Sequence, residues 1–185
     1  MSFKLKPNIT EYQNKCCEFA IYPDKGNNLI YTYLGFLGEL SETFTKYYGP
    51  IYDKNELKKE IGDVYWYISM CFYEIGIREN INLVIEKYYN DVFCIKYMPL
   101  EKFDYDDLRF MLNVCSFSEN LKKQIRDKKE LDINKIKNIL CFGFLRMYEL
   151  CKSFNFDIEE VLEENVEKLT KRKLENKLSG DGDNR

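Results

Sequence analysis

Histidine is absent from the 185-residue chain, and this absence excludes several kinds of catalytic centre. Without an imidazole, neither a Ser-His-Asp nor a Cys-His arrangement can be assembled. A di-iron carboxylate bundle is excluded as well, because it requires Glu-x-x-His motifs. Seven cysteines are present, but no Cys-x-x-Cys pair that would indicate a zinc site. We therefore expect reduced and mostly buried thiols.

Proline and glycine are scarce, at 4 and 9 residues, so long uninterrupted helices are expected. No apolar run approaches the length of a membrane span, and the first residues lack the apolar core of a signal peptide. These absences predict a cytoplasmic protein without a membrane partner. The 28 basic and 31 acidic residues give a net charge of −3, which provides no general attraction to nucleic acid.

What the chain does contain is apolar residues at helical spacing, which predict one all-α domain over residues 1–185. The hydrophobic fraction of 45% is high enough to form a core. After Asp63 the sequence 64–68 (VYWYI) has almost no polar face, so this helix is predicted to be buried all round. The predicted helices span about 8–21, 28–48, 54–75, 80–93, 105–127, 133–154 and 158–174.

Two carboxylate pairs, Glu39-x-x-Glu42 and Glu60-x-x-Asp63, are the most informative motif. Residues three apart on a helix project from nearly the same side. If 28–77 forms a helical hairpin, the four carboxylates converge, and they repel one another unless a cation lies between them. An all-oxygen ligand set suits Mg²⁺, with Mn²⁺ as a substitute.

The first pair also allows a simpler interpretation, because Glu39 and Glu42 lie where an ordinary solvated helix face would lie. Gly35 and Gly38 on the same side argue for something more specific. Glycine inside a helix costs up to about 1 kcal/mol relative to alanine. Two of them predict a close approach to the backbone, either by a ligand or by a packed helix.

Residues 105–154 resemble a degenerate copy of 28–77 at a shift of 77 positions. The chemistry is absent from the copy, where Ser116, Lys137 and Leu140 replace Glu39, Glu60 and Asp63. This pattern predicts a pseudo-symmetric duplication in which only the first half keeps a site. Chance similarity of two amphipathic hairpins is the alternative. The matched positions pair Glu42 with Glu119, Leu37 with Val114, Phe44 with Leu121, Ile68 with Leu145 and Met70 with Met147.

These motifs together resemble the MazG-like nucleoside triphosphate pyrophosphohydrolases, the all-α NTP pyrophosphatase family. Residues 34–42 (LGFLGELSE) and 59–67 (KEIGDVYWY) resemble its two metal motifs. Residues 20–23 (AIYP) resemble the segment before the first motif, and 165–172 (NVEKLTKR) resemble its last helix. The closing 180–185 (GDGDNR) resemble the glycine-rich tail of some members.

The resemblance implies Mg²⁺-dependent hydrolysis of a ribo- or deoxynucleoside triphosphate to a monophosphate and pyrophosphate, in control or cleansing of the nucleotide pool. Glu39, Glu42, Glu60 and Asp63 would hold the metal. Glu39 or Glu42 would orient or deprotonate the attacking water, and the sequence does not choose between them.

The resemblance also implies substrate contacts on the last helix and on the helix of the second motif. Lys168, Arg172 and Asn165, on a helix within 156–178, would contact phosphates. Tyr67, one turn past Asp63, would stack against the base, and a core aromatic is the alternative. Lys59, which directly precedes Glu60 in the second motif, is a further candidate for substrate binding. Without the resemblance, the three residues of the last helix read as an ordinary polar face, and Lys59 as a solvated side chain.

The chain departs from the family at 78–155, which is longer than small members need. We expect either a homodimer or a pseudo-dimeric monomer whose degenerate half replaces part of a partner subunit, with 179–185 as a flexible tail. The rival functions are a decayed helical interaction protein and a regulatory nucleotide-binding module. A nucleic-acid binder is not expected, because acidic residues interrupt its basic cluster of Lys122, Lys123, Arg126, Lys128 and Lys129.

Overall fold

The computed structural model describes residues 3–50, 53–93 and 105–179, and in this part of the chain the protein is all-helical, with no strand. The helix boundaries agree with the predicted ones to within a few residues. The first helix ends at Phe19 rather than near residue 21, and the helix predicted over 80–93 is α-helical only to Tyr88 and then π-helical. The elements are α1 (Ile9–Phe19), α2 (Leu29–Tyr48), α3 (Lys54–Glu74), α4 (Ile81–Tyr88), the π-helical η1 (Tyr89–Phe93), α6 (Tyr105–Asp127), α7 (Ile133–Ser153) and α8 (Ile158–Leu174).

Side-chain caps fix where several helices begin. The carboxylate of Asp53 accepts from the backbone N–H of Asn55 at 2.8 Å, and Asp157 accepts from that of Glu159 at 2.9 Å. Such a cap satisfies a backbone donor that the helix itself leaves unpaired, and it is worth about 1 kcal/mol. Asp53 and Asp157 begin α3 and α8, the two helices that carry most of the predicted site.

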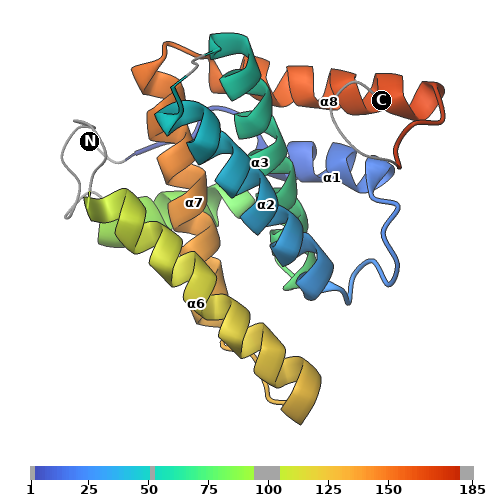
Figure 1. The fold of residues 1–185 in the computed structure, drawn as a ribbon, viewed down its shortest axis with the longest axis vertical. Helices are drawn as coiled ribbons and strands as arrows, with labels where there is room; N and C mark the ends of the chain where they lie inside the picture. Colours follow the sequence, from blue (N-terminus) through green and yellow to red (C-terminus); the bar gives the residue numbers. More distant parts are fainter. Residues whose placement is uncertain (1–2, 51–52, 94–104, 180–185) are drawn as a thin grey trace.

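Helix α3 forms the centre of the molecule, with α2, α7, α8 and α1 packed around it (Figure 1). Its side chains at Leu57, Ile61, Val64 and Phe72 have no solvent exposure. The prediction that the second half of this helix is buried all round is confirmed for most positions. Trp66, Tyr67 and, at the helix end, Tyr73 and Glu74 are the exceptions, because they are only partly buried.

Helices α1 and α8 lie side by side against α3 (Figure 1). Helix α8 approaches α3 at Gly62, where an added Cβ would come within 3.2 Å of the Cβ of Asn165. Because position 62 has no side chain, Asn165 reaches the neighbouring Asp63. On the other side of α3, the 28–77 segment forms the predicted hairpin of α2 and α3.

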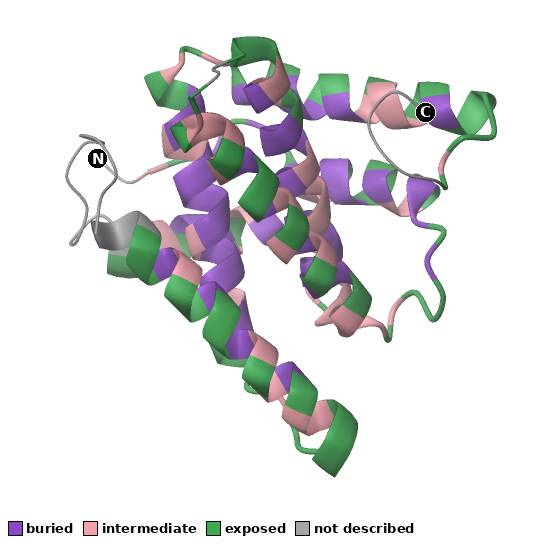
Figure 2. Ribbon diagram, viewed as in Figure 1, coloured by how far each residue is buried: buried purple, intermediate pink, exposed green. Residues whose placement is uncertain are grey.

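Helices α6 and α7 form a second hairpin, whose far end extends from the body and is largely exposed (Figure 2). Its inner end is anchored by Tyr33, whose hydroxyl donates to the carbonyl of Val114 at 2.7 Å. The apolar positions matched at the 77-residue shift pack into the core in both hairpins. Either a duplication or two unrelated amphipathic hairpins would give this result, so the duplication stays a prediction.

Two further expectations concern the state of the cysteines and the absence of a membrane-spanning helix. In the described part of the chain all six cysteines are free, four of them are buried, and Cys115 is exposed. Among the helices described here, none has the length and apolar character needed to cross a membrane. Most of the flexible tail predicted over 179–185 falls at 180–185, outside the described residues.

Candidate metal and nucleotide site

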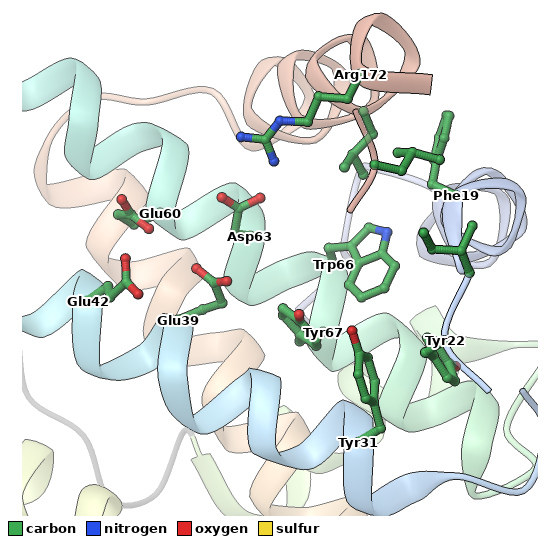
Figure 3. Close-up of a pocket in the computed structure, with 13 residues that line it drawn as sticks. Phe19, Tyr22, Tyr31, Glu39, Glu42, Glu60, Asp63, Trp66, Tyr67 and Arg172 are labelled. Atoms are coloured by element: carbon green, nitrogen blue, oxygen red, sulfur yellow. The ribbon is translucent and has the colours of Figure 1, made fainter. Parts of the chain in front are cut away.

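A cavity of about 230 Å³ lies between α2, α3 and α8, and most of the predicted site residues line it (Figure 3). One end is acidic, with Glu39 and Glu42 projecting from α2 and Glu60 from α3. The other end is aromatic. A pocket with a charged end and an aromatic end suits a ligand that is itself polyanionic at one end and planar at the other.

The acidic end brings three of the four predicted carboxylates together. One oxygen each from Glu39, Glu42 and Glu60 lies within 4.8 Å of the others. Within the described residues, the side-chain carboxylates of Glu39 and Glu42 have no hydrogen-bond or ion-pair partner. Three carboxylates at this separation repel one another, so the metal-free arrangement is electrostatically unfavourable.

Asp63 differs from the prediction that all four carboxylates converge. It lines the same cavity, but its two oxygens accept from the Asn165 amide, at 2.8 Å, and from the Lys168 ammonium. The sequence motif did not reveal this, because α8 supplies both partners from 102 and 105 residues away. A cation at the three-carboxylate cluster would therefore lie near Asp63, but the charge of Asp63 is already neutralised by Lys168.

Glu39 shows the electrostatic consequence of the cluster. Burial, followed by the negative charges of Asp63, Glu42 and Glu60, raises the pKa of Glu39 from 4.5 to about 8. Lys168 opposes this shift only in part. In the metal-free protein Glu39 therefore carries a proton over much of the neutral range.

Glu60 is held from behind by a residue that the sequence analysis missed. The ammonium of Lys46, one turn after Glu42 on α2, hydrogen-bonds the buried Glu60 carboxylate and lies 3.2 Å from Glu56. Partial burial works against the charged ammonium, but the hydrogen bonds to Glu60 and Glu56 raise the pKa of Lys46 overall. Lys46 itself does not line the cavity.

The aromatic end is formed by Trp66 and Tyr67 of α3, by Tyr31 of α2 and by Tyr22 from the segment between α1 and α2 (Figure 3). The rings of Trp66 and Tyr67 meet edge to face, with centroids 4.8 Å apart, and those of Tyr22 and Tyr31 stack at 4.8 Å. Burial and the adjacent Tyr31 raise the pKa of Tyr67, so its hydroxyl stays protonated.

The predicted phosphate ligands take three different positions. Arg172 reaches from α8 toward the acidic end and lines the cavity (Figure 3). Asn165 and Lys168 contact Asp63, as described above, and do not line it. Lys59 points elsewhere, with its ammonium 2.6 Å from Glu56, and it lines a separate small pocket with Lys58 and Lys168.

The donor set fits a hard divalent cation. It consists of carboxylate oxygens close enough to share one ion. Two of the carboxylates have no partner among the described residues, and one has a raised pKa. Mg²⁺ prefers oxygen ligands and keeps several waters, so three carboxylates at the edge of an open cavity suffice. Glu39, Glu42 and Glu60 would hold the ion.

The sequence contained signals for some of the missed residues. Lys46 follows Glu42 by four positions and Trp66 follows Asp63 by three, so helical spacing alone places them on the acidic side. Tyr31, Tyr22 and Phe19 also line the cavity, but no local pattern distinguishes them among 15 tyrosines and 13 phenylalanines.

Comparisons of the chain with family models, with curated proteins and with solved structures give no match in any of the three. The family resemblance therefore stays a prediction from the two carboxylate motifs. The geometry of the cavity is the independent observation on which a function can be argued.

Proposed function

We propose that the protein is a Mg²⁺-dependent nucleoside triphosphate pyrophosphohydrolase, with Mn²⁺ as an alternative ion. The observation that carries the proposal is one cavity that joins a three-carboxylate cluster to an aromatic enclosure. A nucleotide matches both ends, because its phosphates need a cation between themselves and the carboxylates, while its base is a flat ring. Hydrolysis to a monophosphate and pyrophosphate is what the sequence resemblance adds.

Each group of the cavity has a role in this proposal. Glu39, Glu42 and Glu60 bind the cation, which supplies charge neutralisation of the phosphates and a more acidic bound water. Glu39 or Glu42 would orient or deprotonate the attacking water, as the resemblance implies. Arg172 faces the phosphates from α8, and the aromatic end, with Tyr67, holds the base.

Three residues receive revised roles. Asn165 and Lys168 hold Asp63 in place, so they act on the site through that carboxylate. Lys59, which contacts Glu56, is not needed by the proposal.

The experiment is a measurement of Mg²⁺-dependent pyrophosphate release across a panel of ribo- and deoxynucleoside triphosphates, including damaged bases. Glu60→Gln and Asp63→Asn should abolish release while circular dichroism shows a folded protein. Glu119→Gln is the control for loss of a glutamate outside the cavity, because Glu119 lies on the second hairpin, is exposed and pairs with Lys122. Full activity in Glu60→Gln would reject the metal assignment.

A regulatory nucleotide-binding module is the second candidate, and one observation favours it. Asp63 pairs with Lys168 and Asn165 and does not belong to the three-carboxylate cluster. Calorimetric binding of a nucleotide with Mg²⁺, without release of product from any member of the panel, would support this alternative.

A further inference from the structure

Lys46 and Glu60 form a contact behind the acidic end of the cavity. The side chain of Glu60 is only 2% exposed, whereas that of Lys46 is 30% exposed. Glu60 lines the cavity and Lys46 does not, so the ammonium neutralises the carboxylate without being part of the cavity wall. Glu56 lies 3.2 Å from the same ammonium and helps to fix it there.

A buried carboxylate is costly to the fold unless a charge compensates it. For Glu60 the cost is greater, because Glu39 and Glu42 place two further oxygens within 4.8 Å. The positive charge of Lys46 offsets part of this repulsion without entering the cavity. It therefore lets the three carboxylates stay together in the absence of a bound cation.

Resting on the proposed function, we infer that Lys46 is a built-in counter-ion of the metal centre. It holds Glu60 at the cavity edge before the metal arrives, and it also opposes the metal, because its charge reduces the attraction of the cluster for a second cation. Lys46 is thus a positioning residue that sets both the stability of the metal-free site and its affinity for Mg²⁺.

The chain offers a matched control in a second lysine that compensates a buried glutamate. The ammonium of Lys4 lies 2.9 Å from Glu86, whose side chain is 10% exposed and also accepts from the backbone N–H of Leu5. Glu86 does not belong to the carboxylate cluster. Loss of Lys4 should therefore destabilise the fold in a way that Mg²⁺ does not repair.

The test compares thermal unfolding of wild type, Lys46→Met, Lys46→Arg and Lys4→Met, each without nucleotide, in MgCl₂ and in NaCl of equal ionic strength. Isothermal titration with MgCl₂ gives the affinity. Lys46→Met should have a lower Tm than wild type without Mg²⁺ and a larger Mg²⁺-induced rise. Its Mg²⁺ affinity should be higher by about tenfold, since one opposing charge has been removed.

Lys46→Arg should behave like wild type, and Lys4→Met should lose stability equally with and without Mg²⁺. If Lys46→Met does not fold, Lys46→Gln, which is also neutral, carries the same comparison. A Mg²⁺ response of the neutral variant equal to or weaker than that of wild type would overturn the inference and leave the metal site standing. Failure of the wild type to respond to Mg²⁺ would overturn the metal site together with the inference.

Discussion

The ring of Tyr67 lies against the backbone of α2 at Gly35, in the space that a side chain at position 35 would occupy. An ideal Cβ added to Gly35 would overlap the tyrosine ring itself. This packing draws Tyr67 back from the centre of the cavity and leaves its ring as a wall of the aromatic end. Glycine is unfavourable inside a helix, and the packing of Tyr67 explains why α2 has one at position 35.

Gly35→Ala is predicted to weaken nucleotide binding while Mg²⁺ binding is retained. The new methyl group displaces Tyr67 toward the ligand space, and overpacking of this kind costs about 1–3 kcal/mol of stability. Loss of one aromatic wall should lower nucleotide affinity by about tenfold. Calorimetric titrations with Mg²⁺ and with a non-hydrolysable nucleotide, together with urea unfolding, measure the three quantities.

Gly38→Ala is the matched control on the same helix. An added Cβ at Gly38 meets nothing within 4 Å, so the substitution brings only the higher helix propensity of alanine. We expect a gain of up to about 1 kcal/mol in the free energy of unfolding. If Gly35→Ala were as stable as Gly38→Ala and bound nucleotide normally, the Tyr67 packing would not matter to the site.

The stability of the metal-free protein is predicted to fall as the pH rises from the ordinary glutamate pKa of 4.5 to about 8, the value for Glu39 in the fold. Burial and the neighbouring carboxylates raise this pKa, so the folded state binds more protons than the unfolded chain in that window. Stability from the protonated Glu39 is complete below the window and is lost above it. Thermal unfolding in EDTA across this range measures the decline.

Two comparisons isolate Glu39 as the cause of this decline. Glu39→Gln cannot ionise and should flatten it, whereas Glu119→Gln on the second hairpin should leave it unchanged. Saturating Mg²⁺ should also remove the decline, because a cation favours the charged carboxylate. An undiminished decline in Glu39→Gln would assign the effect to other groups.

Local sequence patterns were sufficient to predict the helices and the side of α2 on which Glu39 and Glu42 lie. Apolar spacing gave the hairpin of α2 and α3, and three-residue spacing placed Glu39 and Glu42 on one side of it. The apolar sequence after Asp63 correctly predicted a central, buried helix. The helical spacing and the side on which each carboxylate pair lies depend on residues within about one turn of each other, so the sequence contains these two features directly.

Contacts between distant helices were not predictable from the sequence. The pairing of Asp63 with Lys168 depends on how α8 crosses α3 at Gly62, and nothing near Asp63 indicates that crossing. The neutralisation of Glu60 by Lys46 depends likewise on the register of the α2–α3 hairpin. Charge patterns identify ionisable residues but do not specify which partner each one finds.

Asn165 is predicted to act through Asp63, not through direct contact with substrate. It is 4% exposed, its amide donates to Asp63, and its oxygen accepts from the Tyr12 hydroxyl at 2.8 Å. Asn165→Ala removes the hydrogen bonds to Asp63 and to the buried Tyr12 hydroxyl, so a loss of about 1–3 kcal/mol in the free energy of unfolding is expected. Urea unfolding measures this loss.

A double-mutant cycle with Tyr12→Phe tests the assignment. If the Tyr12–Asn165 bond is the main contribution, the double variant should be much less destabilised than the sum of the two single variants. Additive losses would show that the two side chains act independently, and the bond from Asn165 to Asp63 would then be the better explanation of the lost stability.

Trp66 should report directly on ligand binding, because it is the one tryptophan of the chain and it lines the aromatic end of the cavity. A base that stacks near the indole changes its environment, so titration with a non-hydrolysable nucleotide in Mg²⁺ should quench or shift the fluorescence. Inorganic triphosphate, which has no base, should compete for the acidic end without producing the same change. Equal spectral changes with both ligands would mean that the base does not enter the aromatic end.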